Sequence, residues 1–265
     1  GTDSNGNGIY SPIKGSWSDD GGKTSSVDTY GGFYIARYEA GVPSNAPFYA
    51  NTNGAKYETS SKKNTDQYIP VSKKNTPSWN YISQTNSKTV SENMYGESKT
   101  IKSYLIDGTA WDTITQWVSD STKKSVTDST AWGNYFDSSY TLKGLYARHQ
   151  GRTAKDNVWR WFPAYVYNNG SYTKGSEYTE VATGVTVEGD PTRNSACNIY
   201  DMAGNMWEWP TETGKHDSKA TDATNYAVLR GGSFNWSGSD APVSYRNGNN
   251  SVGDYNINIG FRVVL

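Results

Sequence analysis

Short runs of alternating or branched apolar residues predict three β segments in this chain. Residues 32–39 alternate between apolar and polar side chains and lie between glycine and proline residues. Residues 228–230 lead into Gly231 and Gly232, and residues 259–265 end the sequence; both runs are rich in branched side chains. Runs of this kind, bounded by turn-forming residues, are typical of strands. We expect the folded domain to begin near the first of them.

Helical spacing of apolar residues predicts two helices. Thr76 and Pro77 suit a helix N-terminus, because threonine caps and proline fits the first turn. The imperfect apolar stripe that follows consists of Trp79, Ile82, Val90 and Met94. Thr109 precedes a second stripe, whose spacing predicts one buried face on a helix of about three turns. Its members are Trp111, Ile114, Trp117 and Val118. We expect these tryptophans to pack in the core rather than to form a ligand platform.

Composition indicates a loop-rich globule. Only 34% of residues are hydrophobic and the mean hydropathy is −0.80, but 14% are aromatic, whereas disordered chains carry few aromatic residues. Residues 123–192 scatter Gly, Ser, Thr and Asn among aromatic residues without helical periodicity, which predicts packed loops and short strands. No repeat or linker divides the sequence. We therefore expect one α+β domain over residues 31–265, with a variable tract described below, after a leader or N-terminal extension at residues 1–30.

The leader contains a short segment that is weakly similar to the start of a calcium-binding loop. Residues 3–8 read Asp-Ser-Asn-Gly-Asn-Gly, but Lys14 stands where such a loop needs a bidentate glutamate. A polar turn or flexible leader is the preferred interpretation.

Charge, hydropathy and cysteine content exclude several classes of function. The chain carries 25 Lys and Arg against 26 Asp and Glu, a net charge of −1, which offers no basic surplus for a nucleic-acid backbone. No apolar run approaches the roughly 18 to 20 residues that cross a bilayer, so we expect no direct membrane insertion. Cys197 is the single cysteine, which excludes an internal disulfide and a thiolate-rich metal site.

Four motifs, read in order, carry a family resemblance. They are residues 32–39 (GFYIARYE), 198–209 (NIYDMAGNMWEW), 229–234 (LRGGSF) and 259–262 (IGFR). This series resembles the formylglycine-generating enzyme (sulfatase-modifying factor) family, over about residues 31–265. The resemblance implies an α+β fold of the C-type-lectin-like kind, loop-rich, with two helices and short antiparallel sheets.

The chain departs from the enzymes of that family. Its oxidases bind copper through a pair of cysteines near the C-terminus, but residues 230–265 contain no cysteine, and Cys197 lies alone before the central motif. The related iron-dependent sulfoxide synthases need a histidine cluster, whereas His149 and His216 are the only histidines. No paired-carboxylate motif or triad is evident. We therefore expect a protein that is not an enzyme and binds no copper.

The tract of residues 233–258 suggests a different role. It contains six asparagines among Gly, Ser, Asp and Tyr, between an Arg-Gly-Gly and a Gly-Phe-Arg. This layout is similar to the variable proteins of diversity-generating retroelements. There, randomised template adenines let an AAC or AAT codon become Asn, Ser, Asp, Gly, Tyr, Phe, Val or one of several other residues. Trp236 cannot arise in this way and is expected to be a fixed scaffold residue. The alternative is an Asn- and Gly-rich surface loop of a nonvarying family member, because these residues favour turns in any protein.

We expect the diversified side chains to face solvent and to bind a ligand. They are Phe234, Asn235, Ser237, Asp240, Tyr245, Asn247, Asn249, Asn250, Gly253, Asp254, Tyr255, Asn256 and Asn258. Tyrosines with small polar residues are the composition of antibody paratopes. The resemblance implies a display protein on a bacterial cell surface or phage particle, whose partner is a protein or glycan on a cell surface. The alternative function is a divergent or inactive sulfatase-modifying-factor-like protein without a variable tract.

The resemblance also implies a calcium site in the central motif. Its ligands would be the carboxylates of Asp201 and Glu208 and backbone oxygens of Gly204 and Met206, and hard oxygen ligands suit calcium. The alternative is that Asp201 caps a turn and Glu208 pairs with Arg230 or Arg262.

Overall fold

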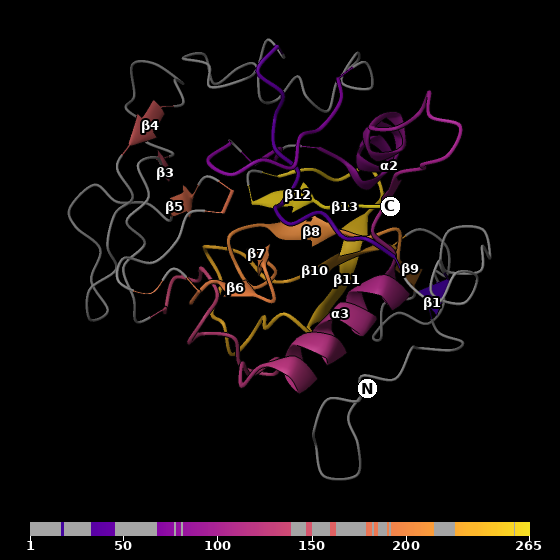
Figure 1. Cartoon of the computed structure of the whole chain (residues 1–265). Helices are drawn as coiled ribbons and strands as arrows, with labels where there is room; N and C mark the ends of the chain where they lie inside the picture. Colours follow the sequence, from indigo (N-terminus) through magenta and orange to yellow (C-terminus); the bar gives the residue numbers. More distant parts are fainter. Residues whose placement is uncertain are drawn as a thin grey trace.

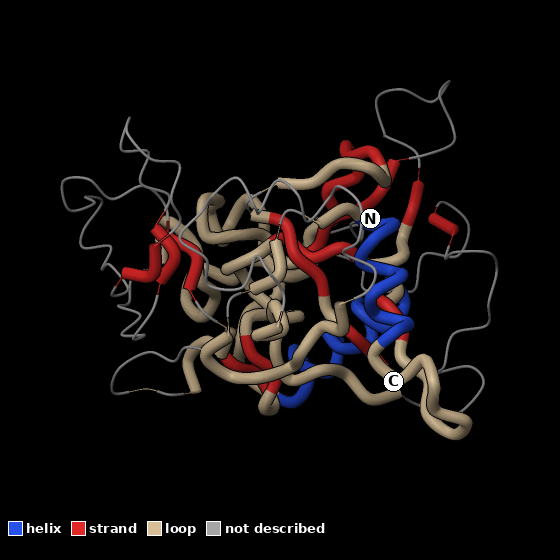
Figure 2. The backbone as a smooth tube through the Cα atoms, turned by 90° about the horizontal axis from the view of Figure 1, so that it is seen from above, coloured by secondary structure: helices blue, strands red, loops and turns tan. Residues whose placement is uncertain are grey.

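The computed structural model describes residues 17–18, 33–45, 68–76, 78–80, 82–138, 147–149, 160–162, 179–181, 183–184, 190, 192–214, 226–256 and 258–265. Within them the chain forms helices α2 (Gln84–Asn93) and α3 (Gly108–Ser121) and thirteen strands, the longest of six residues. Loops make up much of the remainder (Figures 1 and 2). The expected loop-rich α+β fold with two helices is confirmed.

A six-stranded sheet forms the centre of the molecule (Figure 1). Its strands, in spatial order, are β1 (Trp17–Ser18), β9 (Thr213–Gly214), β10 (Tyr226–Arg230), β8 (Trp207–Trp209) and β12 (Ile259–Phe261), and β11 (Arg246–Ser251) pairs with β10. β12 runs parallel to β8, whereas the other pairs are antiparallel. Because β1 pairs with β9, two residues of the expected leader lie in this sheet; the rest of residues 1–30, with residues 3–8, lies outside the described residues.

Smaller sheets complete the fold. They are β2 (Tyr104–Leu105) with β13 (Val263–Val264), β6 (Ser195–Ala196) with β7 (Ile199–Tyr200), and β3 (Ala147–His149) between β4 (Arg160–Phe162) and β5 (Thr179–Val181). The predicted C-terminal strands are confirmed as β12 and β13, and the predicted strand at residues 228–230 as part of β10. The segment predicted at residues 32–39 runs beside β13, but with one bridge, Ile35 to Val264.

Helix α3 begins one residue before the predicted cap. Asp107 caps it by accepting a hydrogen bond from the backbone N of Ala110 on Oδ1 at 2.6 Å. Trp111 is buried, as predicted, but Trp117 is 46% exposed. The expectation for Trp117 is wrong because six residues at about 100° per residue place it some 240° around the helix from Trp111.

Helix α2 begins at Gln84, not near Thr76 as predicted. Ser83 caps it by accepting from the backbone N of Asn86 at 3.2 Å. Ser78 instead bridges to Gly41, and the backbone N of Trp79 donates to Ala40 O at 2.8 Å. Tertiary pairing with an extended segment therefore overrides the local cap signal.

Two apolar clusters bury the sheet and the helices. One joins residues of β8, β10 and β12 to Val90 of α2, and the other joins α3 to residues 126–135 and 196–203. Among the largest side chains without exposure are two arginines, Arg230 and Arg262. Arg230 lies among carboxylates next to the 233–258 tract, and Arg262 lies among carboxylates of and near the central motif.

Candidate binding face and its buried ion pairs

Hydrogen bonds hold the first half of the 233–258 tract against residues 125–138. Asp137 accepts from Ser237 Oγ at 2.8 Å and from the backbone N of Gly238 at 3.0 Å. Farther along, the backbone N of Val243 donates to Ser129 Oγ at 3.1 Å, and Ser244 Oγ donates to Val126 O at 2.7 Å. This half of the tract is therefore not a free loop.

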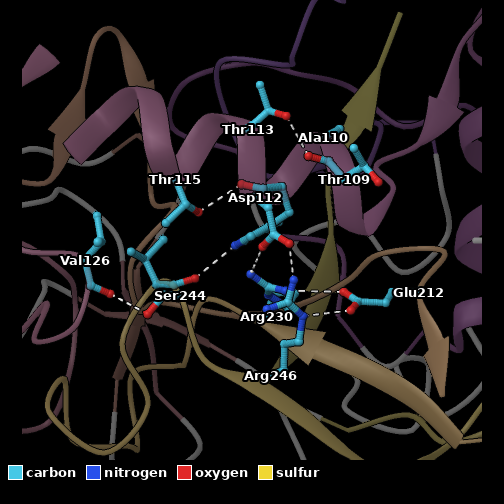
Figure 3. Close-up of polar contacts among 12 residues, drawn as sticks. Thr109, Ala110, Asp112, Thr113, Thr115, Val126, Glu212, Arg230, Ser244 and Arg246 are labelled. Atoms are coloured by element: carbon cyan, nitrogen blue, oxygen red, sulfur yellow. Dashed lines mark hydrogen bonds and ion pairs between the residues drawn. The ribbon is translucent and has the colours of Figure 1, made fainter. Parts of the chain in front are cut away.

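Four charged side chains, here named the Arg230 cluster, fix the second half (Figure 3). Arg230 of β10 and Arg246 of β11 lie opposite each other in the ladder. Arg230 contacts Asp112 of α3 at 2.8 Å and Glu212 at 3.3 Å. Arg246 contacts Glu212 at 2.8 Å through Nε and Asp112 through Nη2. Two guanidinium groups thus balance two carboxylates and tie the tract to a helix and to the main sheet.

Two aromatic rings of the tract contact a buried ring of β8. Trp207 is 2% exposed, and its ring contacts Trp236 edge-on at 5.7 Å and Tyr245 at 6.1 Å between centroids. Trp236 and Tyr245 remain 40% and 42% exposed. Trp236, predicted as scaffold, therefore also contributes ring surface to solvent.

The structure divides twelve of the thirteen predicted ligand-binding residues into three groups. Exposed residues are Asp240, Tyr245, Gly253, Asp254, Tyr255 and Asn256, and partly exposed ones are Asn235, Asn247 and Asn250. Phe234, Ser237 and Asn258 are buried, and the side chain of Asn249 lies outside the described residues.

The expectation of solvent-facing side chains is wrong for the three buried residues. Asn258 donates through Nδ2 to Ser233 Oγ at 3.3 Å and to Asn235 Oδ1 at 3.0 Å, and its carbonyl accepts from Trp207 N at 2.8 Å. Ser237 is turned inward by its bond to Asp137, and the backbone of Phe234 bonds to Asn205 O at 3.0 Å. The composition of the tract did not distinguish these buried, hydrogen-bonded residues from the exposed ones.

A second buried charged group, here named the Arg262 cluster, joins Asp201 and Glu208 of the central motif (residues 198–209) to Glu39 and Arg262. Arg262 Nη2 contacts Glu208 Oε1 at 2.6 Å, and Arg262 Nε donates to both Glu208 oxygens, at 3.2 and 3.0 Å. Asp201 accepts from the backbone N of Gly184 at 2.7 Å and from Asn194 Nδ2 at 3.2 Å. Three carboxyl groups share one guanidinium group here.

Burial acts on all three carboxyl groups of this cluster. It raises the pKa of Glu39 well above its usual value, and the charges of Asp201 and Glu208 raise it further. It raises the pKa of Asp201 to about 6 and also raises that of Glu208. Desolvation disfavours a buried charge unless enough opposite charge surrounds it, and Arg262 alone is not enough for three acids.

The calcium site that the resemblance implies stays a prediction, and the structure shows which hydrogen bonds its residues form. Nitrogen donors already occupy the carboxylates of Glu208 and Asp201, and the backbone N of Met206 points at Glu39 Oε1 at 3.1 Å. Gly204 lies beside Met206 in the same loop, with its backbone N on Gly231 O at 2.8 Å. Among the described residues no group of three His, Cys, Asp or Glu side chains could hold a metal ion. The alternative for Glu208 is what the structure shows, with Arg262 rather than Arg230 as its partner.

Comparison with known proteins decides the family. Residues 25–265 match the family of the Sulfatase-modifying factor enzyme 1-like domain (FGE-sulfatase). The chain belongs to the sulfatase-modifying factor family. The recognition made from the four motifs is thereby confirmed, and the family includes enzymes.

Other comparisons of this sulfatase-modifying-factor domain add little. No curated protein matches it. Among solved structures it is similar to Treponema denticola variable protein 1, with 30% identity over 25% of this chain and 27% of that chain, and a TM-score of 0.21. The match spans about a quarter of each protein. Among the described residues, no helix is both long and apolar enough to cross a bilayer.

Several functional-site residues of this sulfatase-modifying-factor domain were missed by sequence reasoning. Glu39 ends a motif that carried the family resemblance, but its role at the centre of the Arg262 cluster was not predicted. Arg246 is the only Lys or Arg in residues 233–258, which was an available signal that it has a fixed partner. Asp112 follows a buried tryptophan in α3, and Glu212 follows the central motif; neither position alone indicates an ion pair.

Proposed function

We propose that this protein is a non-catalytic ligand-binding protein, and that the exposed side chains of residues 233–258 recognise the ligand and are diversified by a retroelement. One observation carries the proposal: exposed Tyr, Asn and Asp side chains stand on a backbone that the Arg230 cluster and the bonds to residues 125–138 hold in place. A fixed backbone with changeable surface residues is what a diversified binding face requires.

The chemistry of the exposed residues supports binding. Tyrosine offers rigid contact area at low entropic cost, and asparagine and serine offer adaptable hydrogen bonds. The absence of cysteine from residues 230–265 supports a role other than that of the family's copper-binding oxidases. The proposed ligand is a protein or glycan on a cell surface, and the proposed location is a bacterial surface or phage particle.

One observation favours a second candidate. Three of the thirteen proposed positions are buried and hydrogen-bonded, so part of the tract behaves as an ordinary family loop. The second candidate is a divergent or inactive family member whose loop does not vary.

The neighbouring DNA separates the two candidates. Diversification requires a near copy of the tract that differs almost only at adenines, beside a reverse-transcriptase gene; absence of both would favour the second candidate. The structure sharpens this test. Arg246 must stay fixed, so its codon should be one of the three adenine-free arginine codons, CGT, CGC or CGG. The mismatches should end before buried Asn258, because every asparagine codon contains adenine.

Folding measurements test the same proposal on the protein. Simultaneous replacement of Asp240, Asn247, Asp254 and Tyr255 should leave the free energy of unfolding within about 0.5 kcal/mol per site, as for ordinary surface residues. Trp207→Ala, by contrast, should cost roughly 3 to 5 kcal/mol because it opens a cavity. Urea melts compare the two. A fourfold variant as unstable as Trp207→Ala would remove the binding-face interpretation.

A further inference from the structure

Trp236 and Tyr245 combine exposed ring surface with a rigid support. Each ring contacts the buried ring of Trp207, edge-on at an interplanar angle of 77° for Trp236 and tilted by 49° for Tyr245. Trp236 and Tyr245 are nevertheless 40% and 42% exposed to solvent.

The backbone on both sides of these rings is fixed. Trp236 N donates to Ser233 O at 2.9 Å, and Trp236 O accepts from Phe136 N at 3.2 Å. Tyr245 N donates to Pro242 O at 2.8 Å, and the next residue, Arg246, lies in the Arg230 cluster. A partner that docks here would therefore find both rings already placed, which reduces the ordering cost of binding.

Charge indicates which kind of partner fits. Arg246 is the only basic residue of the tract, and its charge is taken up by Asp112 and Glu212. Asp137 is bonded to the two residues that follow Trp236. Asp240 lies in the turn that closes from Ala241 N to Ser237 O at 3.0 Å. Neither carboxylate forms an ion pair with any residue that the structure describes.

Exposed aromatic rings, with carboxylates close to Trp236 along the backbone that form no ion pair among the described residues, suit one side-chain chemistry. A guanidinium or ammonium group is attracted to the face of Trp or Tyr and to a nearby carboxylate, and arginine stacks especially well. We propose that Trp236 and Tyr245 bind an arginine or lysine side chain of a protein partner, with help from Asp137, which is bonded to the two residues after Trp236, and from Asp240, four residues after Trp236. This inference rests on the proposed function and names the partner's chemistry.

Peptide selection tests the proposal directly. The intact protein is used to select from a random dodecapeptide display library, and the best peptides are synthesised with arginine and lysine, or with neutral citrulline and norleucine in their place. We expect the selected peptides to be enriched in basic residues. The neutral forms should bind about tenfold more weakly by fluorescence titration.

Variants of the protein then locate the contact. Trp236→Ala and Tyr245→Ala should each weaken binding of the basic peptide about tenfold. Asp240→Asn should weaken it about threefold at low salt and less at high salt. Trp117→Ala is the matched control, because Trp117 on α3 is 46% exposed and far along the chain from the tract; it should leave affinity unchanged. Circular dichroism confirms that each variant is folded.

The outcomes separate this inference from the proposed function. Peptides without basic residues, no peptide at all, or binding only on a glycan array would overturn the inference. Binding that depends on Asn247 or Tyr255 but survives Trp236→Ala and Tyr245→Ala would do the same while leaving the proposed function intact. Binding that no change in residues 233–258 affects would overturn both.

Discussion

The two buried arginine clusters differ in their balance of charge. The Arg230 cluster pairs two guanidinium groups with Asp112 and Glu212, and one of the two, Arg246, is 15% exposed. In the Arg262 cluster, one guanidinium group at 0% exposure faces Glu208 at 0% exposure, with Asp201 and Glu39 also buried nearby.

This difference assigns the clusters different roles. A balanced cluster joins segments that are distant in sequence without an excess of buried charge, and it is the one that reaches into the 233–258 tract. The unbalanced cluster keeps an excess of acid, so its carboxyl groups take up protons more readily, as the raised pKa of Asp201 and Glu39 indicates. We therefore expect the balanced cluster to hold the 233–258 tract in place, and the unbalanced cluster to make the stability depend on pH.

The largest expected effect is the loss of Arg262. Arg262→Met leaves Glu208 buried without its cation, and breaking a buried pair from one side costs about 3 to 5 kcal/mol. Urea unfolding at pH 7 measures it. The control is Arg193→Met, the same change at the pair with Asp190, where both side chains are about 40% exposed. That change should cost less than about 1 kcal/mol. Equal losses of unfolding free energy for Arg262→Met and Arg193→Met would contradict a stabilising role for the buried Arg262–Glu208 ion pair.

Loss of Arg246 should have a smaller effect. Arg246→Met leaves Asp112 and Glu212 with Arg230 alone, but partial exposure admits water, so we expect a cost of roughly 2 kcal/mol. Hydrogen exchange should show the added opening concentrated in β11. Arg246→Lys keeps the charge but loses the planar fork, so it should recover part of the stability. If Arg246→Met is as stable as wild type, the Arg230 cluster does not hold the tract.

The pH dependence of stability should reflect the unbalanced cluster. The pKa of Asp201 is raised from 3.8 to about 6 in the folded protein, so between about pH 4 and pH 6 the folded state binds more protons than the unfolded state. Linkage then requires that stability falls as pH rises through this window. Asp201→Asn removes the titrating group, and asparagine tolerates the positive φ of 58° at this position. Melts between pH 4 and 7 should show a flatter profile for the variant.

The control for this prediction is Asp190, whose pKa shifts in the opposite direction to that of Asp201. Hydrogen bonds from Thr192 and Arg193 lower the pKa of exposed Asp190, so that group favours folding above its ordinary pKa rather than below it. Asp190→Asn should therefore leave the fall between pH 4 and 6 in place. Identical profiles for Asp201→Asn and wild type would show that Asp201 is not the source of the dependence.

The smallest expected effect is that of chelation. Because nitrogen donors occupy the carboxylates of the Arg262 cluster, EDTA should leave the melting temperature unchanged, and added calcium should not raise it. A ligand that binds only the native state would stabilise it. A fall in melting temperature with EDTA that excess calcium restores would show a calcium site and contradict the donor assignment.

Part of the fold followed from local pattern. The stripe of Trp111, Ile114 and Val118 predicted α3, because three apolar residues at helical spacing need one buried face. The same reasoning misplaced the start of α2, since Ser78 and Trp79 pair with Gly41 and Ala40, and no local signal shows that partner.

The amino-acid sequence by itself determined the family, the loop-rich α+β class and the location of the 233–258 tract, because these follow from local motifs and composition. Tertiary structure alone decided which tract residues face solvent. Phe234 and Ser237 are turned inward by contacts with residues about 30 and 100 positions earlier in the chain. It also decided that Glu208 pairs with Arg262 while Arg230 pairs with Asp112 and Glu212. Electrostatic pairing depends on distance in space, and a chain that folds through long loops brings together charges whose spacing in sequence carries no signal.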